Sequence, residues 1–205
     1  MLSTAAPSLN LSGDFGPDNW GSSLPFSVKV DMQLSVQDIM KLNRDHYEGT
    51  PYDLTKGLAS GPYGDPNRYD VAPVDGMTMQ QAISGSYERA ISMYRTSYSM
   101  IAQARGHLPN QVGGRVWFAP STPANAAYVP LYVTATTIPK PYTTGSLFRY
   151  QSDVAYWKFD SVGNYAARWY AFAMQDVRAT IGTCRYYVKI WSCLIQFDDF
   201  CLIWL

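Results

Sequence analysis

The sequence predicts an α+β fold in which an antiparallel sheet packs against helices, and three segments predict it. Residues 34–48 have a capped, amphipathic helical pattern, residues 113–138 have the pattern of a β-hairpin, and residues 150–181 return to helical spacing. The chain has 205 residues, of which 47% are apolar and 16% charged. That composition is typical of a globular chain with a sizeable buried core.

The first predicted helix lies in "LSVQDIMKLNRDHYE", residues 34–48, after a Gly-, Pro- and Ser-rich segment, residues 1–24, that we expect to be irregular. Ser35 is the predicted N-cap, with Asp38 three residues further on. We expect the helix to end before Gly49. Its apolar face is formed by Val36, Ile39, Met40 and Leu42.

A long loop is predicted next, because "RDHYEGTPYDLTKGLASGPYGDPNRY", residues 44–69, has prolines at positions 51, 62 and 66. We expect this loop to be ordered and to lie near a cleft, its glycines and prolines setting the backbone. Residues 70–88 show no clear period.

Strands are predicted in the middle of the chain. "AISMYRTSYSMIAQA", residues 90–104, reads as one or two strands. "GGRVWFAPS" (113–121) and "AAYVPLYVTATTI" (126–138) flank a turn at residues 122–125 and predict a hairpin. Pro130 predicts an edge position or a bulge in the second strand.

Helical spacing returns over residues 150–181, with Gly163 as the predicted break between two helices. Its apolar positions are Val154, Trp157, Val162, Ala166, Trp169, Tyr170, Phe172 and Val177. Residues 182–205 form a Trp-, Cys- and Phe-rich tail that we expect to be atypical, so we divide the chain into a domain over 1–181 and a tail over 182–205.

Composition excludes several function classes. The net charge is zero and no basic run is present, which argues against a nucleic-acid partner. No apolar stretch is long enough for a membrane span, and residues 1–21 lack the pattern of a signal peptide, so the compartment stays open. Aromatic residues make up 15% of the chain, which fits either half-buried strands or a cleft in which a ligand stacks on aromatic rings. The sequence leaves open whether the chain forms a homo-oligomer.

The cysteines, at positions 184, 193 and 201, all fall in the last 22 residues. Their spacing fits no zinc site, so we expect no metal and no cofactor. The sequence also lacks a phosphate-binding GK[ST] loop, a Gly-x-Ser-x-Gly elbow and a His-x-x-x-His pair. No complete nucleophile–base set is visible.

Two groups of side chains are candidates for a site. In the first, His46 with Asp45 and Glu48 is either a base with an orienting carboxylate or a polar cap on the last helical carbonyls. In the second, Asn164 and Arg168 lie four residues apart and would share a helix face, where they could donate to a carboxylate or an oxyanion. The alternative is a helix-break Asn and a surface Arg. Asp53, Lys56 and Arg68 are expected to tie down the long loop, and His107 to lie in a turn.

Three blocks of the sequence resemble a known family. They begin with "LPFSVKVDMQLSVQDIMKLNRDHYEGTPYDLTKGLASGPYGDPNRY" and continue with "ERAISMYRTSYSMIAQARGHLPNQVGGRVWFAPSTPANAAYVPLYVTATTIPKPYTTG" and "FRYQSDVAYWKFDSVGNYAARWY". They resemble the dipeptidase family of N-terminal-nucleophile (Ntn) cysteine hydrolases, which is related to secernins. The resemblance covers most of residues 5 to 180.

The resemblance implies an αββα sandwich and hydrolysis of dipeptides by a cysteine at the mature N-terminus, with the α-amine of that residue as base. No cysteine precedes position 184. We therefore expect the nucleophile to be encoded upstream, this chain to be a fragment that is inactive alone, and uncovered apolar sheet surface to make it poorly soluble.

We accordingly assign no catalytic residue to this chain. By resemblance, the partner is a dipeptide substrate, and Arg44, Arg68, Asn164 and Arg168 are the candidate substrate-binding residues, the arginines because a guanidinium suits a carboxylate. The alternative functions are a secernin-like, non-catalytic interaction or regulatory protein and an aromatic-rich binding module.

Overall fold

The computed structural model describes residues 5–9, 26–68 and 89–194 and divides the chain into two compact units, residues 1–42 and 43–205. The first unit contains a short 3-10 helix, Pro7–Leu9, and most of α2, Val36–Asn43. Asp31 joins the two segments of this unit, because its carboxylate accepts hydrogen bonds from the backbone N–H and the hydroxyl of Ser8, at 2.8 and 2.6 Å.

The predicted cap of α2 is confirmed. Asp38 accepts from the backbone N–H and hydroxyl of Ser35 at 2.8 and 2.6 Å, and the Ser35 hydroxyl accepts from the Asp38 N–H at 3.2 Å. This reciprocal pair satisfies donors that the start of a helix leaves without partners. Because these hydrogen bonds stabilise the ionised carboxylate, the pKa of Asp38 is below its usual range.

The predicted end of this helix is wrong, since α2 stops at Asn43 and residues 44–48 belong to the loop. Tyr47 has φ 65°, in the left-handed region that a helix cannot contain. Carbonyl groups of this segment instead accept hydrogen bonds from residues outside it. The Asp45 carbonyl accepts from the Ser92 N–H and the His46 carbonyl from the Leu54 N–H, both at 3.1 Å. The rest of the loop is ordered turns with one 3-10 helix, Leu58–Ser60, as predicted.

The sheet of the second unit has three antiparallel strands in the order β1 (Tyr98–Ala104), β2 (Gly114–Pro120) and β3 (Val129–Tyr132). A short helix, α4 (Asn110–Gly113), joins β1 to β2. The hairpin of β2 and β3 is confirmed, with Pro130 opposite Trp117 on a strand that is paired on one side within the described sheet. Both outer strands are shorter than predicted: residues 90–97 form turns, and β3 ends at Tyr132.

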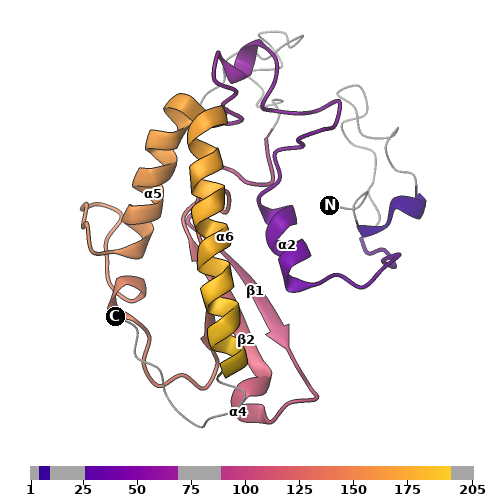
Figure 1. Ribbon diagram of the computed structural model, residues 1–205, viewed down its shortest axis with the longest axis vertical. Coiled ribbons are helices and arrows are strands. Elements are labelled where there is room, and N and C mark those ends of the chain that lie inside the picture. Colours follow the sequence, from indigo (N-terminus) through magenta and orange to yellow (C-terminus); the bar gives the residue numbers. More distant parts are fainter. Residues whose placement is uncertain (1–4, 10–25, 69–88, 195–205) are drawn as a thin grey trace. The chain divides into compact units, whose positions relative to one another are not determined.

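A second 3-10 helix, Lys140–Tyr142, and two long helices complete the unit. These are α5 (Ala155–Ala166) and α6 (Tyr170–Leu194), joined by a 3-10 turn, Ala167–Trp169. The predicted break at Gly163 is wrong, because α5 continues through it and the interruption comes at 167–169. Figure 1 shows α5 beside α6, and α5 also contacts β2.

The core of the second unit forms where the turn after β2 meets the helices. Ala124, Ala166, Tyr170 and Met174 are buried together, with Ala173 and Val177 packed against them. The α+β class with an antiparallel sheet and packed helices is thus confirmed. The full sandwich and the division at residues 181 and 182 stay predictions, and α6 runs across that position.

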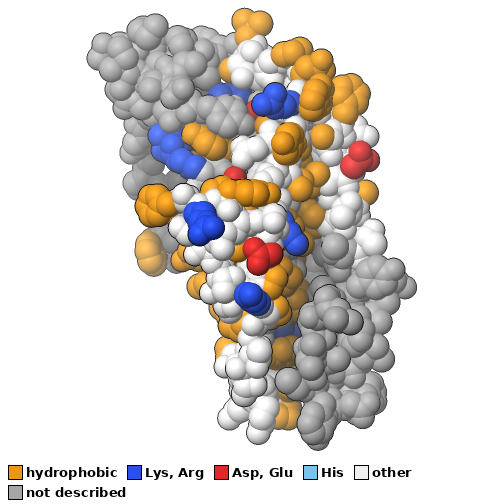
Figure 2. All heavy atoms as spheres, turned by 90° about the vertical axis from the view of Figure 1, so that its left-hand side faces the viewer, with side chains coloured by type: hydrophobic (Ala, Val, Ile, Leu, Met, Phe, Trp, Pro, Cys, Tyr) orange, Lys and Arg blue, Asp and Glu red, His pale blue; other side chains and the backbone are white. Residues whose placement is uncertain are grey.

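Part of the expected apolar helix face is exposed. Val162, Trp169 and Phe172 are each more than two-fifths exposed, and so are Tyr98 and Met100 on β1. The view from the α5 side shows hydrophobic side chains over much of the visible described surface, with few acidic side chains between them (Figure 2). Among the described helices, none is both long enough and apolar enough to cross a membrane.

Candidate functional site

A polar cavity, open to solvent, lies in the second unit. Its walls come from the long loop, the segment before β1, the turn after β2, and helices α5 and α6. Few of these elements are near one another in the sequence. The lining residues are His46, Asn67, Tyr94, Thr122, Ala124, Asn125, Asp160, Gly163, Asn164, Tyr170 and Met174.

The turn after β2 forms one wall and is fixed by hydrogen bonds. Ser121, with φ 67°, adopts the left-handed conformation that turns the chain out of β2. The Thr122 hydroxyl donates to the Tyr94 carbonyl at 2.6 Å, and the buried Ser92 hydroxyl accepts from the Ala124 N–H at 3.1 Å. Residues 92–94 therefore hold the turn in one position.

Arg44 holds the same turn from the other side. Its Nε donates to the Pro123 carbonyl at 2.8 Å and its NH2 to the Ala126 carbonyl at 2.9 Å. The guanidinium also lies over the Tyr128 ring, 4.9 Å from the centroid. A planar guanidinium with several donors suits this arrangement, which a lysine could not reproduce.

Asn125 crosses from the turn to α5. Its Nδ2 donates to the Phe159 carbonyl at 2.8 Å. The approach requires Gly163, because a Cβ at that position would lie 1.8 Å from Nδ2. Since a carbonyl only accepts, the amide must present its nitrogen to Phe159, and Oδ1 is the remaining acceptor. Oδ1 is buried with no partner among the described residues.

Asp160 is the carboxylate of the cavity. It accepts from Asn164 Nδ2 at 2.9 Å and from the Ser121 hydroxyl at 3.5 Å. Burial raises its pKa, although both hydrogen bonds act to lower it. No basic side chain forms an ion pair with Asp160 within the described part of the chain. Partial burial without a nearby cation disfavours the ionised form of a carboxylate.

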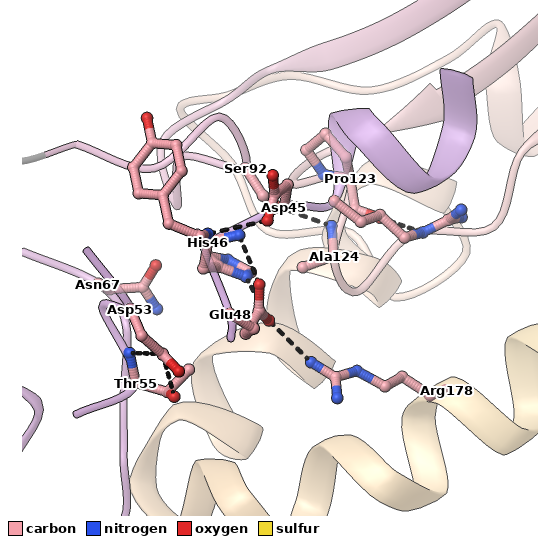
Figure 3. Close-up of polar contacts among 12 residues, drawn as sticks. Asp45, His46, Glu48, Asp53, Thr55, Asn67, Ser92, Pro123, Ala124 and Arg178 are labelled. Atoms are coloured by element: carbon pink, nitrogen blue, oxygen red, sulfur yellow. Dashed lines mark hydrogen bonds and ion pairs between the residues drawn. The ribbon is translucent and has the colours of Figure 1, made fainter. Parts of the chain in front are cut away.

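His46 is held by Glu48 and not by a helix end. Only 1% of its side chain is exposed, its N–H donates to Glu48 Oε2 at 2.7 Å, and its Nδ1 lies 3.3 Å from Oε1 (Figure 3). Because a carboxylate only accepts, Nδ1 carries the hydrogen of this contact. The alternative of a cap on the helix is wrong, while Glu48 has the position of an orienting carboxylate. Asp45 accepts instead from the Tyr47 N–H at 2.8 Å.

Glu48 and Tyr170 connect His46 to α6. Burial acts to raise the pKa of Glu48, but hydrogen bonds from the ring and N–H of His46 outweigh it and lower that pKa to about 2. Arg178 NH2 lies 3.3 Å from Oε1 of the same carboxylate. The His46 and Tyr170 rings meet edge to face, with centroids 6.0 Å apart.

The hydroxyl of Tyr170, on the cavity wall, interacts with Arg178. It is buried, and no hydrogen bond of good geometry to it is found among the residues that the structure describes. Burial is the main cause that raises the pKa of Tyr170. The charges of Glu48 and Asp65 add to it, whereas the charge of Arg178 and its contact with the hydroxyl oppose it. The phenol is therefore neutral and can donate or accept.

The predicted site residues are only partly brought together. Asn164 lines the cavity, whereas Arg168 lies exposed in the 3-10 turn beyond the end of α5 and is not among the residues that line it. Arg68 donates to the carbonyls of Asp65 and Leu54 at 3.3 and 3.2 Å, tying down the loop as predicted. The substrate-binding role stays a prediction for all four residues.

A second, smaller cavity adjoins the first, because Asn67 and Tyr94 line both. The described part of its wall includes Arg68, Arg89 and Arg95 but no acidic residue. In the long loop, Asp53 accepts hydrogen bonds from Thr55 and from the Gly49 N–H. The residues described contain no cluster of three His, Cys, Asp or Glu side chains that could hold a metal ion.

Sequence reasoning missed Asn125, Asp160 and Tyr170. Asn125 was visible only as a turn residue, and Tyr170 only as one apolar position of a helix. Asp160 carried no signal of its own, although its spacing of four residues from Asn164 matches their hydrogen bond. The nearest sequence signal was Gly163 inside a helical pattern, which often marks a close approach.

Comparison with known proteins finds similarity to one peptidase family and to two proteins named as dipeptidases. The profile of Peptidase family C69 matches residues 9–182. A probable dipeptidase of Latilactobacillus sakei is 30% identical over 121 residues, which is 59% of this chain and 21% of that protein. Dipeptidase A of Lactobacillus helveticus is 27% identical over 135 residues, which is 66% of this chain and 24% of that protein. The chain thus spans about a quarter or less of the length of these curated relatives.

Proposed function

Because the chain belongs to peptidase family C69, we propose that it serves the hydrolysis of dipeptides by a cysteine-type Ntn reaction. The observation that carries the proposal is the family match over residues 9–182, together with two relatives named as dipeptidases. The polar cavity supports it, since all of its lining residues, 46 to 174, lie within the matched segment.

In the proposed reaction, a cysteine sulfur attacks the peptide carbonyl carbon and the carbon–nitrogen bond breaks. The released amine takes up a proton, and water then hydrolyses the thioester. None of the cysteines in this chain, all at position 184 or beyond, is proposed as this nucleophile. The proposed contribution of the chain is to bind and orient the dipeptide.

Two of the four proposed substrate-binding residues gain support from their positions. Asn164 lines the polar cavity, and Arg68 lines the arginine-rich cavity that adjoins it. A guanidinium there would suit the carboxylate of a dipeptide. Arg44 and Arg168 remain proposals without such support, because Arg44 donates to the turn and Arg168 lies outside the residues that line either cavity.

The proposal is tested with the purified 205-residue chain and a panel of dipeptides, measuring binding by calorimetry and release of free amino acids by mass spectrometry. We expect saturable binding of dipeptides without turnover. Absence of both binding and turnover would contradict the proposal and favour a secernin-like interaction role. Turnover that disappears in Cys184→Ser, Cys193→Ser or Cys201→Ser would show that our exclusion of these cysteines is wrong.

A further inference from the structure

We propose that the polar cavity is a binding site for a primary ammonium group, held by Asp160 and Asn125, and that it receives the α-ammonium of the dipeptide. The second half of this inference rests on the proposed function. The first half concerns the chemistry of the cavity alone and can be tested separately.

The charge of the cavity favours a cation. Among the described residues that line it, Asp160 is the only acidic one, and none is a lysine or an arginine. Its two hydrogen-bond donors, Asn164 and Ser121, are neutral. The one other ionisable base on the wall, His46, is already paired with Glu48. A bound anion would be repelled by the Asp160 carboxylate with no lysine or arginine on the described wall to offset it. A bound ammonium would supply the positive charge that this carboxylate lacks.

An unsatisfied polar atom points the same way. Asn125 is 94% buried, since only 6% of it is exposed, and its Oδ1 has no partner among the described residues. The Phe159 carbonyl fixes the amide so that this atom is an acceptor. A primary ammonium has three donors, and the Asp160 carboxylate and Asn125 Oδ1 offer acceptors for them.

The neighbouring cavity supplies the opposite polarity. Of the residues that the structure describes, its wall includes Arg68, Arg89 and Arg95 and no acidic residue, and it shares Asn67 and Tyr94 with the polar cavity. A dipeptide is a zwitterion, with an ammonium at one end and a carboxylate at the other. The two adjoining cavities would therefore orient it in one direction, its ammonium toward Asp160 and its carboxylate toward the arginines.

L-alaninamide is the probe of the ammonium site, because it has an α-ammonium but no carboxylate and no peptide bond to a second residue. N-acetyl-L-alaninamide is the matched neutral probe. We expect the chain to bind the first at least about tenfold more tightly, as the loss of a hydrogen bond to a charged group requires. The side-chain amide signals of Asn125 and Asn164 should shift in NMR spectra with L-alaninamide only.

Asp160→Asn should abolish the preference, because asparagine keeps the shape and the contact with Asn164 but removes the charge. Asp176→Asn is the control, since Asp176 is an exposed residue of α6 outside the cavity wall. Equal binding of the two probes, or a preference that Asp160→Asn leaves intact, would overturn the site. If Asp160→Asn does not fold, the two probes and the Asn125 signals of the natural chain decide.

L-alanyl-L-alanine and its N-acetyl form then test the dipeptide. If the free dipeptide binds tightly and Asp160→Asn weakens this binding, the result supports the proposal that the ammonium site receives the α-ammonium of the substrate. Binding of both dipeptide forms with equal affinity would leave the proposed function in place and refute the role of the ammonium site in it. Asp160-dependent binding of L-alaninamide without binding of either dipeptide would keep the ammonium site and refute its link to dipeptide hydrolysis.

Discussion

Gly163→Ala tests the contact that shapes the polar cavity. In a helix interior this substitution normally stabilises a protein, by about 1 kcal/mol. Here we expect the opposite sign, because the new Cβ would lie 1.8 Å from Nδ2 and 2.8 Å from Cγ of Asn125. The overlapping atoms all belong to the Asn125 side chain, so this side chain must rotate away and its bond to the Phe159 carbonyl must break.

The magnitude follows from three contributions. Leaving a buried donor and acceptor unpaired costs about 1–3 kcal/mol, and overpacking costs about 1–3 kcal/mol. The gain in helix propensity offsets about 1 kcal/mol of this. We therefore expect Gly163→Ala to lower the free energy of unfolding by about 1–5 kcal/mol.

Urea unfolding followed by circular dichroism measures the effect. Gly182→Ala in α6 is the matched control, because nothing lies within 4 Å of its added Cβ, and it should stabilise the chain by about 1 kcal/mol. In the Asn125→Ala background the overlap is gone, so Gly163→Ala should lose its penalty there. If Gly163→Ala stabilises as much as Gly182→Ala, or costs the same with Asn125 removed, the reasoning is refuted.

Three further predictions concern stability and association. Asp53, whose side chain is 6% exposed, has its pKa lowered from 3.8 to about 2 by hydrogen bonds from Thr55 and the Gly49 N–H that outweigh burial. The ionised Asp53 carboxylate therefore stabilises the fold above pH 3.8, and this stabilisation is lost as the pH falls through about 2. In urea unfolding measured at a series of pH values, the natural chain should lose about 1–2 kcal/mol of its free energy of unfolding over this range for this reason, and Asp53→Asn should not. Arg44→Lys should cost about 1–3 kcal/mol, measured as a lower urea midpoint, because one ammonium cannot replace two guanidinium bonds to the turn; an unchanged midpoint would contradict this role. The exposed apolar side chains of α5 and β1 should make the chain poorly soluble, and a monodisperse, sharply melting monomer in size-exclusion chromatography and calorimetry would count against that expectation.

The sequence predicted the local features well where neighbouring residues decide them. The cap of α2 needs only Ser35 and Asp38, three residues apart, and the β2–β3 hairpin needs only the alternation of side chains around a turn. Boundaries were less predictable. The end of α2 at Asn43 depends on bonds from Asp45 and His46 to Ser92 and Leu54, which no local pattern contains.

The candidate site was predictable only in fragments. Asn164 was found from its position on a helix, but its partner Asp160 was not. The role of Asn125 depends on a carbonyl and a glycine more than thirty residues away, at Phe159 and Gly163. Arg168 lies in the 3-10 turn at 167–169, outside the residues that line the cavity, so its predicted role gains no support from its position.

The sequence by itself determined the α+β class, the capped helix, the hairpin and the family resemblance, because each is encoded by residue types at short, regular spacings. Only the tertiary structure decided which polar groups share a cavity and which of them lack partners. Asp160, Asn125 and Tyr170 come from three separate elements, and their charge and hydrogen-bond balance exists only after those elements pack. Burial sets that balance, and burial is a property of the folded chain.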